Sequence, residues 1–186
     1  MARELRRPMS RERALGRAVS GRARPVPGAA ADQLRRLEEA RGRDEARRRL
    51  GVSERTLRRW RAGAQPSRAN AERLSREAQI NPRREARFRN RGAYVRISGT
   101  IGGSPGGRRK NWRHQTIGEG WEPIHLGGDQ MGELLDLYYA GEDDAAMEAL
   151  REAVGDAYGF ERIQWDDLTR LEFLRDNPAR GEWQEF

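Results

Sequence analysis

Few types of reactive or ligand-binding side chain occur in this sequence, and arginine is the most abundant of them. The chain has no cysteine and two histidines, His114 and His125. This composition excludes thiol nucleophiles, thiolate metal sites, disulfides and a histidine-rich metal cluster. Of the 37 basic residues, 36 are arginines and one is Lys110. Arginine carries a planar set of donors that suits phosphate groups and guanine, so the composition favours a nucleic-acid ligand.

Charge is distributed unevenly along the chain. Residues 1–113 contain 32 basic and 11 acidic residues, a net charge of +21, whereas residues 114–186 contain 5 and 18, a net charge of −13. This asymmetry indicates that the front part of the chain, residues 1–113, binds a polyanion and that residues 114–186 have a different function. No apolar run approaches the roughly 20 residues that span a bilayer, and the charged N-terminus is not followed by the apolar stretch of a secretory signal. We therefore expect a cytoplasmic, nucleoid-associated protein with no membrane partner.

The strongest functional pattern lies in residues 46–60, ARRRLGVSERTLRRW, which is typical of a helix-turn-helix DNA reader. Gly51 permits the positive φ that a tight turn needs, and Ser53 is a favourable N-cap for the helix that follows. Leu57 and Trp60 would seat that second helix on a hydrophobic core. The alternative is an ordinary helical hairpin whose charged face is only solvated.

The opposite face of the second helix carries the residues that we expect to contact DNA. Arg55 and Arg59 are the predicted base contacts in the major groove, and Arg58 and Arg61 are the predicted phosphate contacts. Any one of them could instead be an exposed surface charge. Further DNA-binding residues are predicted at Ser53, Thr56, Arg83, Arg84, Arg87, Arg108, Arg109 and Lys110.

The elements that position these residues follow from hydrophobic periodicity. Residues 1–30 are predicted to be a flexible basic arm, with a short helix near residues 11–20 when DNA is bound. Residues 31–91 are predicted to form an all-helical DNA-binding domain. Its helices are expected near residues 32–41, 44–50, 53–62, 67–78 and 83–90.

From residue 92 to residue 186 the pattern becomes that of a small acidic α+β domain. Residues 93–98 alternate with period two, which predicts a strand. Asp143-Asp144 and Asp166-Asp167 are interpreted as helix starts, where carboxylates complement the helix dipole. Further strands are expected at residues 112–117, 123–126, 160–165 and 171–174, and helices at residues 130–140 and 143–157. The predicted fold class of the whole chain is therefore α+β.

The order of a basic arm, the turn Leu50-Gly51-Val52-Ser53, a β-containing middle and the terminal run Leu168-Thr169-Arg170-Leu171-Glu172-Phe173-Leu174 resembles the actinobacterial (Streptomyces-type) telomere terminal proteins. The resemblance implies a protein that becomes covalently attached to the 5′ ends of linear replicons. Its partners would be double-stranded and single-stranded DNA ends, a telomere-binding protein and a DNA polymerase that uses a protein hydroxyl as primer. The acidic domain would contact the polymerase, the telomere-binding protein or a second copy of the chain.

The same resemblance implies a priming hydroxyl. Thr116 ends the basic run 108–116 where the charge changes sign, and it matches the family's priming threonine. The alternatives are that Thr116 is a plain strand residue, or that the hydroxyl belongs to Ser98, Thr100 or Ser104. The chain would accept a nucleotide rather than act as an enzyme by itself. It would need no metal and no cofactor of its own, because the polymerase would supply Mg²⁺.

Two other functions remain open from the sequence. A helix-turn-helix transcription or plasmid-maintenance regulator would use the C-terminal domain for dimerisation. A nicking enzyme would use Tyr138 or Tyr139 as nucleophile, but such enzymes hold a metal with closely spaced histidines, and His114 and His125 are not close in sequence. Tyr138 is expected in the core, with Tyr139 half exposed. The glycine-rich run 102–107 lacks the Lys-Ser/Thr of a phosphate-binding P-loop.

Overall fold

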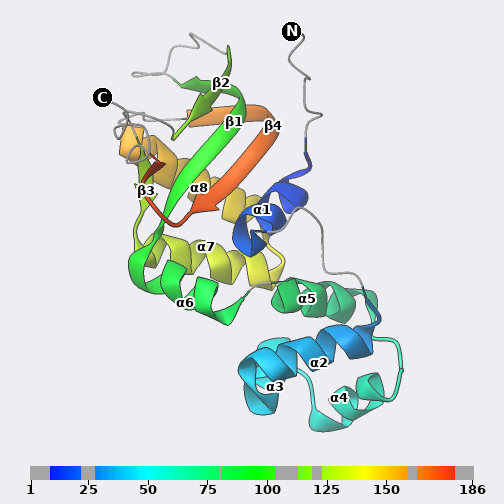
Figure 1. Cartoon of the computed structure of the whole chain (residues 1–186). Helices are drawn as coiled ribbons and strands as arrows, with labels where there is room; N and C mark the ends of the chain where they lie inside the picture. Colours follow the sequence, from blue (N-terminus) through cyan, green and yellow to red (C-terminus); the bar gives the residue numbers. More distant parts are fainter. Residues whose placement is uncertain are drawn as a thin grey trace, which may run out of the picture.

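The computed structural model describes residues 9–21, 28–79, 81–103, 113–118, 123–158 and 163–178, and Figure 1 shows how its helices and strands are arranged. The helices are α1 (Arg11–Ser20), α2 (Ala30–Arg41), α3 (Arg43–Leu50), α4 (Glu54–Arg61), α5 (Arg68–Gln79), α6 (Pro82–Arg91), α7 (Gly128–Ala140) and α8 (Asp143–Tyr158). The strands are β1 (Ala93–Gly103), β2 (Arg113–Ile117), β3 (Ile124–Leu126) and β4 (Ile163–Leu174). The predicted α+β fold class is confirmed.

β1 is the central strand of an antiparallel sheet. It pairs with β2 and β3 along one edge and with β4 along the other. In Figure 1, α8 lies behind the sheet and α7 runs below it, while α1 lies beside β4. The buried side chains of the sheet therefore point towards α8, and the front face of β1 and β4 is covered by neither α7 nor α8.

Two separate hydrophobic cores divide the chain, and their boundary differs from the predicted one. The small core lies among α2, α3, α4 and α5 and consists of Leu34, Leu37, Ala46, Leu50, Leu57, Trp60 and Leu74. The large core joins the sheet to α7 and α8, and it also contains Phe88 of α6 and four residues of α1. The helical unit therefore ends with α5 at Gln79 rather than at residue 91, because α6 packs on the α+β unit.

Residues 11–20 form a helix that is packed into the large core without DNA. Ser10 caps α1 by accepting a hydrogen bond from the Arg13 N–H at 3.3 Å, and Gly21, with a φ of 68°, ends it. The buried residues of this helix are Ala14, Leu15, Ala18 and Val19. The position of the predicted helix is confirmed, but the prediction of a flexible arm was wrong for these residues. Residues 1–8 and 22–27 lie outside the described part of the chain.

β4 is one continuous strand where the sequence predicts two. Asp166 and Asp167 lie inside it, so their predicted position at a helix start was wrong. The register of β4 against β1 shifts between Ser98 and Thr100, and Asp167 has a φ of 49°. Gly99 faces this bulge, where a Cβ atom would come within 3.0 Å of the Asp166 carbonyl oxygen. A side chain at this position would therefore require the backbone of the bulge to shift by a few tenths of an ångström.

Candidate nucleic-acid interface

The turn between α3 and α4 has the local structure that its residues predict. Gly51 has a φ of 64°, and its N–H donates to the carbonyl oxygens of Arg47 at 3.0 Å and Arg48 at 3.3 Å. Ser53 caps α4, because its Oγ accepts from the Thr56 N–H at 3.2 Å and lies 3.0 Å from the Thr56 hydroxyl. A three-residue turn therefore satisfies the end of one helix and the start of the next.

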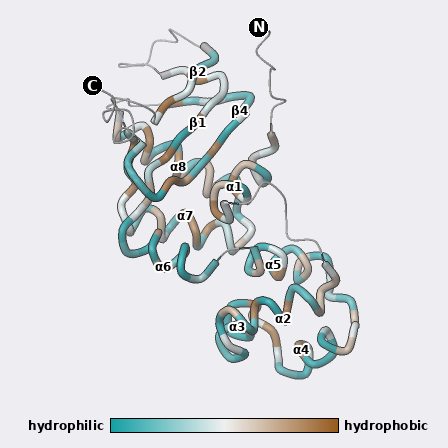
Figure 2. The backbone as a smooth tube through the Cα atoms, viewed as in Figure 1, coloured by the Kyte–Doolittle hydropathy of each residue, from teal (hydrophilic) through white to brown (hydrophobic). Residues whose placement is uncertain are grey.

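α4 is held against the small core by one face and exposes arginines on the other. Leu57 and Trp60 are 0% and 4% exposed, whereas Arg55, Arg58 and Arg59 are exposed. Figure 2 shows the outer sides of α3 and α4 as mainly hydrophilic. Within the described ranges, none of these three guanidinium groups forms an ion pair with a carboxylate, although the charge of Arg58 acts on Glu54 from a longer distance. Their charges are therefore available to an external anion.

α3 adds further positive charge beside α4. Arg43, Arg47 and Arg48 are all exposed. Arg48 pairs with Glu45 at 2.5 Å and Arg47 with Asp44 at 3.9 Å. Arg43 forms no ion pair in the described part of the chain, although its charge acts on Glu54 from a longer distance. A hollow of about 400 Å³ lies beside the turn, and two arginines and two carboxylates line it together with Gly51 and Val52: Arg47, Arg48, Asp44 and Glu45. Of the exposed arginines of α3, Arg43 is therefore the one that adds to the basic surface of α4 without an ion pair in the described part of the chain.

Arg61, a predicted phosphate contact, is instead used within the fold. Its guanidinium pairs with Glu38 of α2 at 2.5 Å and with Glu54 at 2.8 Å. The hydrogen bonds that Arg61 donates to Glu38 and Glu54 raise the pKa of Arg61 above its ordinary value. Arg61 therefore ties the end of α4 to α2, and its charge is already compensated.

The arginines of α6 also fall into two groups, those that are exposed and those that are bound within the fold. Arg83 is exposed and has no carboxylate partner among the described residues. Arg84 turns inward and donates to two carbonyl oxygens in the last turn of α1 at 3.1 and 3.2 Å, and to that of Phe173 at 2.9 Å. Arg87 donates to the carbonyl oxygen of Arg175. Arg84 and Arg87 thus hold α6 to its neighbours, and they do not belong to the surface formed by α3 and α4.

Two of the candidate priming hydroxyls lie together on adjacent strands. Thr116 of β2 is exposed, and its Oγ1 lies 2.8 Å from the Oγ of Ser98, which is directly across on β1. Thr100 pairs with His114 two positions further along the same ladder. Ser104, Arg108, Arg109 and Lys110 lie outside the described residues.

The structure does not bring these hydroxyls close to the arginines of α4. In Figure 1, α4 lies at the lower end of the molecule and β2 at the upper end, with α5, α6 and α7 between them. A duplex bound to α4 would therefore have to extend along the molecule to reach Thr116.

A buried ionic cluster, which has no counterpart in the sequence predictions, connects the two cores. Glu85 of α6 is 2% exposed. Its carboxylate accepts hydrogen bonds from Arg49 at 2.8 Å, Arg89 at 3.2 Å and the Tyr139 hydroxyl at 3.0 Å, and it also pairs with Arg41. Burial raises the pKa of Glu85, but the bonds from Arg41 and Arg49 outweigh it and lower the pKa to about 2. This carboxylate is therefore ionised in the folded protein at neutral pH.

The sequence predicts that Tyr139 is half exposed, but in the structure this residue is buried. It is 9% exposed, and burial raises the pKa of its hydroxyl. No local sequence pattern predicts the hydrogen-bond partner of Tyr139, because Glu85 is 54 residues away in the chain. The prediction that Tyr138 lies in the core is confirmed, at 2% exposed.

The fold and the interface together define a helix-turn-helix unit joined through charged side chains to an α+β unit. No protein-family model, curated protein or solved structure matches the chain. Over the described ranges, three or more metal-ligating side chains do not gather at one place. In the same ranges no helix combines the length and hydropathy needed to cross a membrane.

Proposed function

We propose that the protein binds duplex DNA through α3 and α4. The observation that carries this proposal is the row of Arg55, Arg58 and Arg59. These residues are exposed, they form no ion pair with a carboxylate within the described ranges, and they lie on a helix fixed by Leu57 and Trp60. A rigid helix with exposed guanidinium groups can enter the major groove, where arginine reads guanine, while neighbouring arginines bind phosphates.

The particular role that we propose is that of a terminal protein of linear replicons. The support is the resemblance stated above, together with the position of Thr116, an exposed residue of β2 whose hydroxyl is hydrogen-bonded to that of Ser98. Thr116 Oγ1 would attack the α-phosphorus of a deoxynucleoside triphosphate, the bond to the leaving pyrophosphate would break, and the hydroxyl proton would pass to a base of the polymerase or to water. A partner polymerase would supply the Mg²⁺ ions that neutralise the phosphates. The acidic helices α7 and α8 offer a surface for that polymerase, for a telomere-binding protein or for a second copy of the chain.

The separation of α4 from Thr116 sets the geometry of such a complex. A compact chain of this length has a diameter on the order of 40 Å. That length corresponds to roughly a dozen base pairs at about 3.4 Å each. The proposal therefore places the sequence read by α4 about this far from the DNA end.

A helix-turn-helix regulator is the second candidate, and the same separation favours it. In a regulator the α+β unit serves dimerisation, so α4 and β2 need not meet on one DNA end. A dimer would bind a site with two symmetric halves, one helical turn or a multiple of it apart.

Transfer of a labelled deoxynucleotide in an extract that contains the replication proteins tests the proposed role. We expect label on the wild type and on Thr116→Ser, which keeps the hydroxyl, but not on Thr116→Ala. Thr100→Ala, on the neighbouring strand, is the matched control and should be labelled. Label on Thr116→Ala would exclude this site while leaving the function in place. No label on the wild type, together with tight binding of a palindromic duplex, would exclude priming and leave the regulator.

A further inference from the structure

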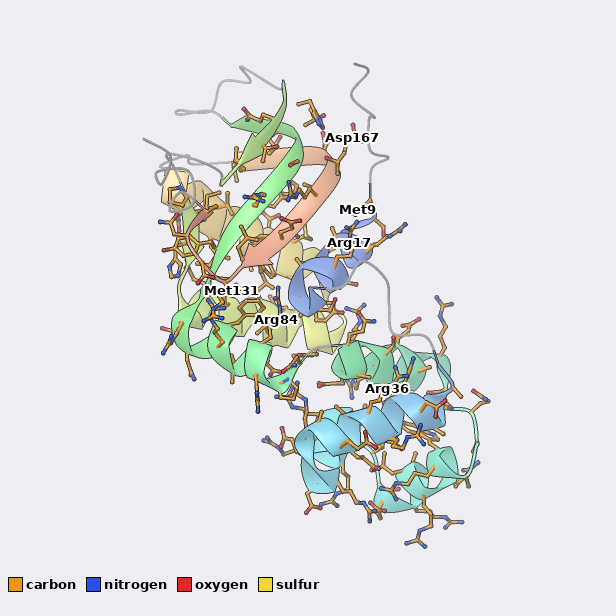
Figure 3. All side chains as sticks on the ribbon, viewed as in Figure 1. Met9, Arg17, Arg36, Arg84, Met131 and Asp167 are labelled. Carbon is orange, nitrogen blue, oxygen red and sulfur yellow. The ribbon has the colours of Figure 1, made fainter. Side chains whose placement is uncertain are left out.

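A second cationic site lies where α1, α6 and β4 meet, away from α4. It is a pocket of about 350 Å³, with Arg17 of α1, Arg84 of α6 and Arg170 of β4 among its lining residues. Figure 3 labels Arg17 on α1 and Arg84 below it. Pockets that bind small molecules commonly begin at about 300 Å³, so this one has the size of a ligand site.

The charges that line this pocket do not balance. Glu172 is the one carboxylate among its described lining residues, and it is shared between Arg170 at 2.9 Å and Arg96 at 3.6 Å. The C-terminal end of α1 also contributes about half a negative charge through the helix dipole. Among the described lining residues, the three guanidinium groups of Arg17, Arg84 and Arg170 therefore outnumber the one carboxylate.

Arg84 is bound only by neutral groups among the described residues. Its hydrogen bonds go to neutral carbonyl oxygens, its guanidinium lies 4.7 Å from the centroid of the Phe88 ring, and no described carboxylate pairs with it. Burial and the positive charge of Arg87 lower the pKa of Arg84. A cation partly removed from water gains stability when an anion joins it, so the pocket favours a negatively charged occupant.

We propose that this pocket binds a phosphate group, carried by a nucleotide or by the 5′ end of a DNA strand. Guanidinium groups from three different elements present donors from several sides, which suits a tetrahedral anion with three oxygens and up to two negative charges. A carboxylate offers two oxygens and one charge, and it would use fewer of these donors. The remaining volume has room for the organic part of a phosphate ester. The inference does not rest on the proposed function, because the pocket is separate from α4 and from Thr116.

Calorimetric titration of the full chain tests the site. The first probe is a deoxynucleoside 5′-monophosphate, and the second is a short DNA single strand, titrated once with and once without a 5′-phosphate. The variant is Arg17→Gln, because the one described side-chain contact of Arg17 is with the sulfur of Met9 at 3.2 Å. The matched control is Arg13→Gln, which removes the same charge from an exposed position of α1 that does not line the pocket. Thermal denaturation verifies that both variants fold.

Arg17→Gln should weaken phosphate binding about tenfold, as expected for the loss of one charge-assisted contact, whereas Arg13→Gln should change it less than twofold. Arg17-dependent binding of the monophosphate identifies a free nucleotide as the source of the phosphate. Arg17-dependent preference for the 5′-phosphorylated strand identifies a DNA end. The proposal is overturned if neither probe binds in an Arg17-dependent manner, or if both variants lose the same affinity.

Discussion

The guanidinium of Arg76 donates two parallel hydrogen bonds of 2.7 Å each to the carboxylate of Asp143. Arg76 belongs to α5 of the helical unit, and Asp143 begins α8 of the α+β unit. Arg76 also donates to the Tyr138 carbonyl oxygen at 2.9 Å and lies 4.9 Å from the centroid of that ring. The two side chains are only 11% and 19% exposed. This bidentate, largely dehydrated pair fixes the helical unit of α2 to α5 to the α+β unit more firmly than an exposed ion pair could.

Asp143→Asn should lower the free energy of unfolding by about 2 kcal/mol, because it breaks a shielded charge-assisted contact. Asp129→Asn is the matched control, since it also removes a carboxylate from the first turn of a helix, at an exposed position of α7. Its effect should stay within about 0.5 kcal/mol. Urea denaturation measures both values. Equal losses would mean that the helix dipole, and not the pair with Arg76, accounts for the effect.

Glu85→Gln should be more damaging, with a loss of about 3–5 kcal/mol, because it leaves Arg41 and Arg49 beside a neutral group in a buried site. Glu77→Gln provides the comparison. Glu77 is as deeply buried, at 3% exposed, but burial raises its pKa, so a neutral side chain costs less there than at Glu85, whose pKa is lowered. We expect the Glu77 variant to be clearly more stable than the Glu85 variant in urea denaturation. The reverse order would contradict the assignment of Glu85 as the centre of the cluster.

The pKa of Glu85 also predicts a loss of stability in acid. Its folded value of about 2 lies below the ordinary 4.5, so its contribution is fully present above pH 4.5 and disappears as the pH falls towards 2. The difference corresponds to roughly 3 kcal/mol. Glu77 acts in the opposite direction, because a raised pKa gives a contribution present below pH 4.5 and lost as the pH rises through the folded value. Unfolding free energies between pH 7 and 2 should therefore fall less steeply for Glu85→Gln than for the wild type.

Local chemistry explains which parts of the fold could be predicted from the sequence. The positive φ of Gly51 and the cap at Ser53 depend on residues within a few positions of each other, and both are found as expected. The bulge at Asp167 could not be predicted, since it depends on the pairing of β4 with β1 some 70 residues earlier. The placement of α1 in the large core has the same cause, because its four buried apolar residues pack against β4 and α8, which lie far away in the sequence.

The same distinction applies to the arginines. A count of charges along the chain treats all of them alike, yet Arg49, Arg61 and Arg76 are matched with carboxylates 23 to 67 residues distant. These partners are set by tertiary packing and leave no periodic signal. Arg55 and Arg59, by contrast, follow from the helical spacing that buries Leu57 and Trp60. The net charge of +21 over residues 1–113 therefore overstates the charge that is exposed to a DNA ligand.

The arginines of α4 should divide into two classes when DNA affinity is measured against salt. Arg58→Gln should weaken binding to every duplex and reduce the slope of log affinity against log salt by about 0.9, the value for one lost phosphate contact. Arg55→Gln and Arg59→Gln should instead reduce the preference for a selected duplex over a random one by about 1–3 kcal/mol, because they remove base contacts.

Fluorescence anisotropy between about 50 and 200 mM salt covers the range in which phosphate contacts change affinity most visibly. The selected duplex is obtained by enrichment from a random pool. Arg13→Gln removes the same charge from α1 and should leave both the slope and the preference unchanged, since α1 lies on the α+β unit and not beside α4. If Arg13→Gln lowered affinity as much as the α4 variants, net charge alone would attract the DNA. In that case α4 would not be the reading helix.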